Sequence, residues 1–129
     1  MNGYLLDTHT ALWWWTDLPR LGRTGLEIIQ ASEQPIYVSA ASAFEIGLKW
    51  RLGKLPNLGD PRVSYEPLMA RNAFVELGVA NRHAIRAGTL GGAHRDPFDR
   101  LIAAQAPLEG LIVVTRDREI AAFGCEVLW

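Results

Sequence analysis

Short, largely apolar runs alternate with helix-forming stretches along the whole chain, and this alternation limits the folds that the chain can adopt. Each run has only three or four residues and is bounded by glycine, proline or a polar residue, as is typical of buried strands. The predicted strands are residues 3–6, 36–38, 74–77, 111–114 and 125–128. Strands that alternate with helices predict an α/β fold with a mainly parallel sheet, covered on both faces and joined by right-handed crossovers.

The composition indicates one globular domain over residues 1–129, because 49% of the residues are hydrophobic and 21% are charged. No apolar run approaches the ~20 residues of a membrane span, and no signal-peptide pattern is apparent. The single cysteine, Cys125, excludes an internal disulfide and a multi-cysteine zinc site, so we expect a cytoplasmic protein. The net charge is −1, so any nucleic-acid binding must depend on a local patch.

Residues 94–100, His-Arg-Asp-Pro-Phe-Asp-Arg, have the features of a helix start. Asp96 is a good N-cap, Pro97 suits the first helical position, and Asp99 falls at the third, where a carboxylate meets free main-chain N–H groups. Apolar residues at helical spacing follow. Pro107 is expected to shorten this helix by about one turn, because proline lacks an N–H donor.

Four acids fall where an α/β sheet would bring them together. Asp7 and Asp117 each follow a predicted strand, and Glu45 and Asp99 lie in the first turns of helices on the same rim. If the first and fourth strands are neighbours, these side chains face one crevice at the carboxyl edge of the sheet, where open α/β folds bind ligands. Such a cluster repels itself without a cation, and its oxygen ligands suit Mg²⁺ or Mn²⁺ rather than zinc.

Several of these residues also have a purely structural explanation. Capping alone accounts for Asp96, and Ser42 with Glu45 matches a capping box. Lys49, four residues after Glu45, is explained as half of an ordinary surface ion pair. The metal hypothesis therefore depends on the register of four acids rather than on any one of them.

A divalent ion held by carboxylates suits phosphodiester hydrolysis, because it activates water and neutralises the charge that develops on the phosphate. One carboxylate can also accept the proton of the attacking water. Basic residues near the acids are candidates for binding RNA phosphates, although each one alone is better explained as a solvated charge beside a helix. The candidates are Lys49, Arg95, Arg100 and Arg116, with His94 and Arg118 beside them.

Three adjacent tryptophans, Trp13, Trp14 and Trp15, lie in a predicted helix near the N-terminus. They span about 200° of a helix that turns roughly 100° per residue, so they cannot all face one core. We expect two of them to be buried and one to be half-exposed. The alternative is that one belongs to a protein interface.

In these motifs the chain resembles the PIN-domain ribonucleases, and specifically the VapC-type toxins of bacterial and archaeal toxin–antitoxin pairs. The similar stretches run in order through nearly the whole chain: residues 5–9, 38–42, 45–49, 94–100, 103–106 and 114–117. The resemblance implies a three-layer α/β/α fold. It also implies a five-stranded, mainly parallel sheet in the order 3-2-1-4-5.

The resemblance further implies an activity and partners. It implies an Mg²⁺- or Mn²⁺-dependent endoribonuclease that forms homodimers and is inhibited by a cognate antitoxin, whose tail enters the active-site groove. Carried over residue by residue, the acidic site is Asp7, Glu45, Asp99 and Asp117, with Asp96 as an accessory acid that caps its helix. Pro107 departs from the family pattern, in which an apolar residue usually continues the helix.

Two other functions compete with this interpretation. A metal-binding receiver-like module needs two adjacent acids after its first strand and a lysine after its last, whereas here Thr8 and His9 follow Asp7 and no lysine lies beyond Lys54. A catalytically silent regulatory module would act through protein–protein contacts made by its tryptophans. That second alternative predicts that Asp7→Asn leaves every function intact.

Overall fold

The computed structural model describes residues 1–55 and 57–129, and it confirms the predicted alternation of strands and helices. The strands are β1 (Gly3–Leu6), β2 (Ile36–Ser39), β3 (Val75–Leu77), β4 (Leu111–Val114) and β5 (Val127–Leu128). The helices are α1 (Thr8–Thr16), α2 (Arg23–Ala31), α3 (Ala40–Arg51), α4 (Pro61–Arg71), α5 (Asn81–Thr89), α6 (Pro97–Glu109) and α7 (Arg118–Ala122), with a 3₁₀ turn at Leu18–Arg20. None of the described helices has both the length and the apolar character needed to traverse a bilayer.

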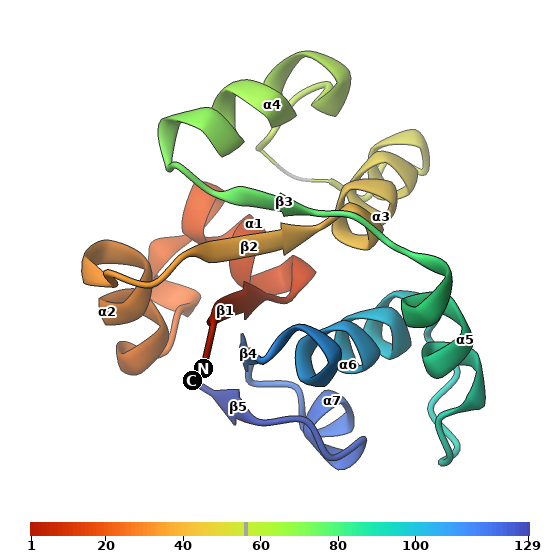
Figure 1. The fold of residues 1–129 in the computed structure, drawn as a ribbon. Helices are drawn as coiled ribbons and strands as arrows, with labels where there is room; N and C mark the ends of the chain where they lie inside the picture. Colours follow the sequence, from red (N-terminus) through yellow and green to blue (C-terminus); the bar gives the residue numbers. More distant parts are fainter. Residues whose placement is uncertain (56) are drawn as a thin grey trace.

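The strands form one parallel sheet in the order β3-β2-β1-β4-β5, as predicted (Figure 1). In the register of the central strands, Leu6 of β1 lies between Val38 of β2 and Val114 of β4. Because the strands are parallel, their carboxyl ends all lie at one edge of the sheet. The residues that follow β1, β2 and β4 are therefore brought together there.

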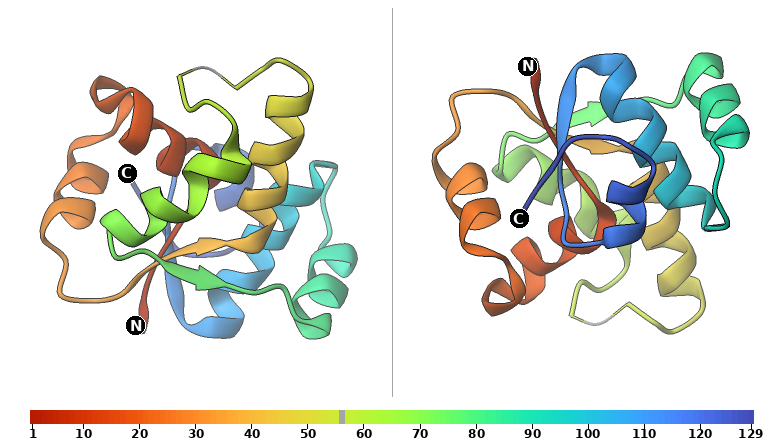
Figure 2. Two further views of the ribbon diagram at one scale, coloured as in Figure 1. Left: turned by 90° about the horizontal axis from the view of Figure 1, so that it is seen from above. Right: turned by 90° about the horizontal axis from the view of Figure 1, so that it is seen from below.

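Helices cover both faces of the sheet, which gives three layers (Figure 2). Leu5 and Val113 pack against α6 and α7, whereas Leu6 and Val114 face a second apolar cluster that α1, α2 and α4 complete. Strand residues alternate between the two faces, as the pleat of a strand requires. Helix α3 contacts α1, α4 and α6, and α5 packs against α6.

Two local expectations are wrong. Helix α6 runs through Pro107 to Glu109 and ends where Gly110 adopts a left-handed φ of 68°. Ser42 and Glu45 form no capping box, because α3 begins earlier. Its N-cap is Ser39, whose hydroxyl accepts a hydrogen bond from the Ala41 N–H at 3.0 Å.

All three tryptophans of α1 are half-buried, so the expectation that two are buried is also wrong. Successive side chains point about 100° apart around a helix, and each indole therefore meets a different neighbour. Trp13 packs edge-on against Trp129, and Trp14 joins the apolar cluster below α2. The indole N–H of Trp15 donates to the Asn72 side chain at 2.9 Å.

Gln105 connects α6 to the carboxyl ends of two strands. Its side chain is fully buried, its Oε1 accepts from the Ser39 hydroxyl at 2.6 Å, and its Nε2 donates to the Gly78 carbonyl at 3.1 Å. These bonds fix the helix that carries Asp99 relative to the edge of the sheet.

We predict that Gln105→Leu lowers the free energy of unfolding by about 1–3 kcal/mol, because it leaves the buried Ser39 hydroxyl without its acceptor. Urea denaturation followed by circular dichroism measures this change. The matched control is Gln30→Leu at an exposed position of α2, with an expected change within about 0.5 kcal/mol. Equal effects of the two substitutions would contradict the structural role of Gln105.

Candidate active site

Asp7 is the most buried of the four predicted acids, with 5% of its surface exposed, and it joins β1 to α1. Its Oδ1 caps α1 by accepting from the main-chain N–H of Thr10 at 2.7 Å and from the Thr10 hydroxyl at 2.8 Å. Its Oδ2 accepts from the Thr115 hydroxyl, which β4 supplies from the neighbouring position. The carboxylate is thus held in place by α1 and by the residue that follows β4.

Asp117 lies beside Asp7, because β1 and β4 are adjacent and parallel. It is the N-cap of α7, and its Oδ1 accepts from the main-chain N–H of Glu119 at 2.8 Å. Its own N–H donates to the Thr115 hydroxyl at 2.9 Å. Thr115 therefore contacts both acids and keeps them in a fixed relation.

Asp99 lies in the first turn of α6, and Asp96 caps that helix as predicted by accepting from the N–H groups of Phe98 and Asp99. The Oδ2 of Asp99 is 2.8 Å from Nε2 of His94, whose Nδ1 contacts Glu119. Because both ring nitrogens face carboxylates, the protonated imidazole is favoured. Its hydrogen bond to Asp99 is the main reason that the pKa of His94 is raised.

The pKa of Asp99 is raised to about 6, chiefly because the carboxyl is removed from water. The hydrogen bond from His94 lowers this pKa, but the negative charges of Asp96, Asp117 and Glu45 raise it further. The pKa of Asp99 is thus raised in part by the charges of two other acids of the predicted site, Asp117 and Glu45. A bound cation would relieve the same repulsion.

Glu45 provides a direct test of whether the residues fit a metal ion. It lies in α3, is only 8% exposed, and its Oε2 is 3.6 Å from Nζ of Lys49. Its Oε1 is buried and has no hydrogen-bond partner among the described residues. A buried carboxylate oxygen without a donor is costly, and a hard cation would satisfy it.

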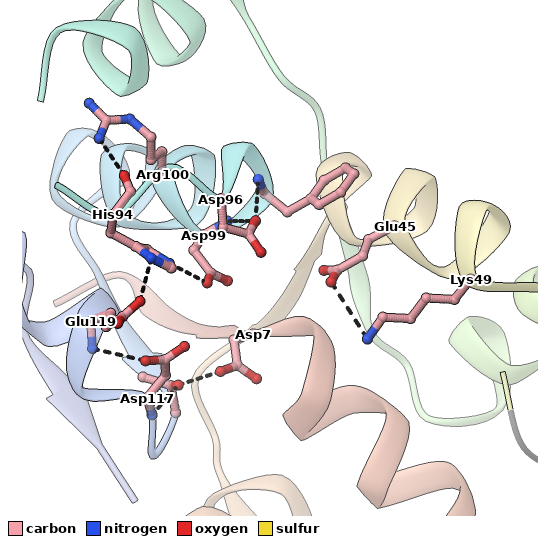
Figure 3. A network of polar contacts seen from close by, with 11 residues as sticks. Asp7, Glu45, Lys49, His94, Asp96, Asp99, Arg100, Asp117 and Glu119 are labelled. Carbon is pink, nitrogen blue, oxygen red and sulfur yellow. Dashed lines mark hydrogen bonds and ion pairs between the residues drawn. The ribbon is translucent and has the colours of Figure 1, made fainter. Parts of the chain in front are cut away.

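The four acids face one opening from three sides (Figure 3). Asp7 and Asp117 reach it from the ends of β1 and β4, Asp99 from the start of α6, and Glu45 from α3. In the part of the chain that the structure describes, no three acidic, histidine or cysteine side chains are already close enough to share an ion. Asp7, Asp99 and Asp117 are each held by hydrogen-bond donors, whereas Glu45 has only the Lys49 ammonium group beside it.

The predicted phosphate-binding residues differ in what their side chains do. Arg95 is exposed beside the acids, and Lys49 lies between Glu45 and His9, with its Nζ 3.3 Å from His9 Nε2. Arg100, in contrast, donates to the main-chain carbonyls of residues 87, 90 and 94. Because these bonds occupy its guanidinium inside the fold, we leave Arg100 out of the phosphate-binding set. Arg116 is exposed and stacks on an indole.

Sequence reasoning missed the groups that hold the acids. Thr10 and Thr115 donate to Asp7, and Glu119 contacts the histidine that donates to Asp99. A weak signal exists for two of them, since Thr10 stands three residues after Asp7 and Glu119 two residues after Asp117, and both acids cap helices. Thr115 and Glu119, however, contact Asp7 and His94 from distant parts of the sequence.

Comparison of the sequence with known protein families finds a match over most of the chain. Residues 4–124 match the PIN domain. The chain belongs to the PIN-domain family. It is 31% identical over 121 residues to ribonuclease VapC22 of Mycobacterium tuberculosis, with 93% of this chain and 91% of that protein covered.

Two solved structures share the PIN fold over nearly their whole length. One is VapBC2 from Rickettsia felis bound to a DNA fragment from its promoter, with a TM-score of 0.72, 17% identity, and 98% and 97% of the two chains covered. The other is a toxin–antitoxin complex from Klebsiella pneumoniae, with a TM-score of 0.66, 19% identity, and 98% and 96% covered. At these identities the likeness shows the fold alone.

The raised pKa of Asp99 predicts how this PIN domain responds to pH without metal. The folded chain keeps a proton on Asp99 up to about pH 6, whereas the unfolded chain loses it near 3.8. The free energy of unfolding therefore falls as the pH rises through this window. Asp99→Asn removes the effect and should stabilise the protein at pH 7 by about 2–3 kcal/mol.

Urea denaturation in EDTA at pH 4 and pH 7 measures this difference, which should nearly vanish at pH 4. The side chain of Asp99 is only 18% exposed, so solvent screens the effect little. Glu33→Gln at an exposed site is the control and should change nothing at either pH. A destabilised Asp99→Asn variant at pH 7 would contradict the origin given for the pKa.

Proposed function

We propose that the chain is a divalent-metal-dependent endoribonuclease that acts as the toxin of a toxin–antitoxin pair. The observation that carries this proposal is the unpartnered, buried Oε1 of Glu45, in a site where Asp7, Asp99 and Asp117 face the same opening. The PIN family membership and the likeness to a protein named as a ribonuclease agree with it.

Mg²⁺ or Mn²⁺ suits the site, because all of its candidate ligands are carboxylate oxygens. Asp7, Glu45, Asp99 and Asp117 would hold the ion, and Asp96 would act as an accessory through the helix that it caps. When bound, the ion lowers the pKa of a coordinated water and neutralises charge on the phosphate.

The chain's own residues position the acids and the RNA. Thr10 and Thr115 orient the Asp7 carboxylate, and one of the four carboxylates accepts the proton of the attacking water. Lys49, Arg95 and Arg116 surround the acids and bind the phosphates on either side of the cut. They form the local basic patch that a net charge of −1 does not reveal.

A cognate antitoxin and a second copy of the chain are the proposed protein partners. The antitoxin tail would enter the acidic opening and exclude RNA from it. For the homodimer, Phe44 offers an apolar contact: it is 68% exposed on α3, and its ring lies 5.5 Å from that of Phe98 on α6.

We predict that the wild-type protein cleaves RNA with Mg²⁺ but not in EDTA, and that Asp7→Asn or Asp99→Asn slows cleavage by about two orders of magnitude or more. Digestion of total cellular RNA, with mapping of the cut ends, measures the activity. Asn at position 7 can still cap α1, and Asp99 is not the cap of α6, so both variants should stay folded by circular dichroism.

The control for this experiment is Asp17→Asn, which removes only an exposed ion pair with Arg20. It should cleave like the wild type. Full activity of the folded Asp7→Asn and Asp99→Asn variants in the presence of Mg²⁺ would refute the nuclease proposal and favour the catalytically silent module.

We further predict that Phe44→Glu converts a dimer into a monomer, because it places a charge in an apolar contact between copies. Sedimentation velocity measures the change in mass. Val63→Glu, at a position that is 75% exposed on α4, is the matched control and should remain dimeric. A wild-type monomer, or a dimer that survives Phe44→Glu, would refute the assignment of this surface.

A further inference from the structure

A cavity of about 400 Å³ opens directly beside the acids. It lies between α1 and the loop that joins β4 to α7, and it shares two of the four acids with the candidate active site. Its lining is partly acidic, partly aromatic and partly basic: Asp7, His9, Trp13, Arg116, Asp117 and Arg118. The acids account for catalysis and Arg116 for phosphate binding in the proposed function, but His9, Trp13 and Arg118 have no role there.

Trp13 forms the aromatic wall of the cavity. Its indole packs edge-on against Trp129 with the ring centres 5.9 Å apart, and the ring of His9, one helical turn earlier, lies 5.6 Å away. The guanidinium of Arg20 also lies over the indole, at 5.7 Å. The wall is therefore held in position before any ligand arrives.

Arg116 is fixed on this wall in a way that leaves its hydrogen-bond donors available. Its guanidinium carbon lies 4.6 Å from the centre of the Trp13 ring, a cation–π contact that uses the face of the guanidinium and not its N–H groups. Among the described residues, its side chain makes no hydrogen bond or ion pair. Arg116 thus presents free donors to a phosphate at the mouth of the cavity.

His9 links the cavity to Glu45. Lys49 lies between them, with its Nζ 3.6 Å from Glu45 Oε2 and 3.3 Å from His9 Nε2. His9 thus contacts Lys49 on one side and lines the cavity on the other. The acidic opening and the aromatic wall are therefore parts of one continuous surface.

We infer that this cavity binds the base of one unpaired nucleotide next to the cleaved phosphodiester, an inference that rests on the proposed ribonuclease function. The volume lies within the ~300–1,000 Å³ of small-ligand sites. Single-stranded RNA is bound by stacking its bases on aromatic rings or guanidinium planes, and this wall offers both.

The rings of the lining favour a base over a sugar or a phosphate, because the flat side chains of Trp13 and His9 can stack on a flat base. Arg116 and Arg118, both exposed, bind the phosphates that flank the base. Stacking contacts involve the flat face of a base and not its hydrogen-bonding edges, so we expect the presence of a base to matter more than its identity.

The test compares two decamers of equal charge, oligouridylate and the same ribose-phosphate chain without bases. Fluorescence anisotropy with full-length protein in EDTA measures binding without cleavage. Wild-type protein should bind oligouridylate about 5- to 150-fold more tightly than the abasic chain, the range for one stacked base. Equal affinities would overturn the inference.

Trp13→Leu should remove most of this preference while leaving the affinity for the abasic chain within about 2-fold of wild type. The matched control is Trp50→Leu, because Trp50 also carries an arginine on its ring, Arg62 at 4.9 Å, but does not line the cavity. Trp50→Leu should keep the full preference. A folded Trp13→Leu that keeps it, or a Trp50→Leu that loses it equally, would overturn the inference.

His9→Ala provides a second variant if Trp13→Leu fails to fold, because His9 is exposed and its replacement leaves the core intact. It should lower the preference for bases, and an unchanged preference would count against the subsite. This result is distinguishable from a failure of the proposed function, which would show as an absence of Mg²⁺-dependent RNA cleavage. Cleavage without any base preference would refute the subsite alone.

Discussion

Repulsion among carboxylates at one edge of a parallel sheet is the constraint on which the rest of the structure depends. The fold stabilises each acid with a donor of its own, and it takes these donors from different elements. Threonine hydroxyls hold Asp7, an imidazole holds Asp99, a main-chain N–H holds Asp117 and an ammonium group lies beside Glu45. Only Glu45 keeps a buried oxygen without a donor, among the residues described.

Helix starts contribute to the same stabilisation. Asp7 and Asp117 cap α1 and α7, and Asp99 lies in the first turn of α6. The partial positive charge of a helix N-terminus favours an anion at each of these places. Residues that local chemistry explains as caps are therefore the same residues that the proposed chemistry requires, and the two explanations do not compete.

The strands and the acids were predictable, because strand ends and helix starts leave local signals in the sequence, whereas the sheet order was implied by the resemblance to PIN-domain ribonucleases. What the sequence could not show depends on contacts between distant residues. Arg100 looked free to bind phosphate, yet its donors reach carbonyls of a preceding loop and helix. Likewise, α3 starts at Ala40 because Ser39 caps it, whereas the sequence also offered a capping pattern at Ser42, three residues after Ser39. Side-chain roles of this kind follow from packing rather than from periodicity.

The central claim is that acids from four parts of the chain form one divalent-cation site. Titration of ¹⁵N-labelled protein with Mn²⁺ tests it most directly, because a paramagnetic ion broadens the NMR signals of nearby amides. The account predicts that the amides next to Asp7, Glu45, Asp99 and Asp117 broaden together at substoichiometric Mn²⁺, and that excess Mg²⁺ restores them. Broadening around separate acids at different Mn²⁺ concentrations, or none at this edge of the sheet, would contradict it.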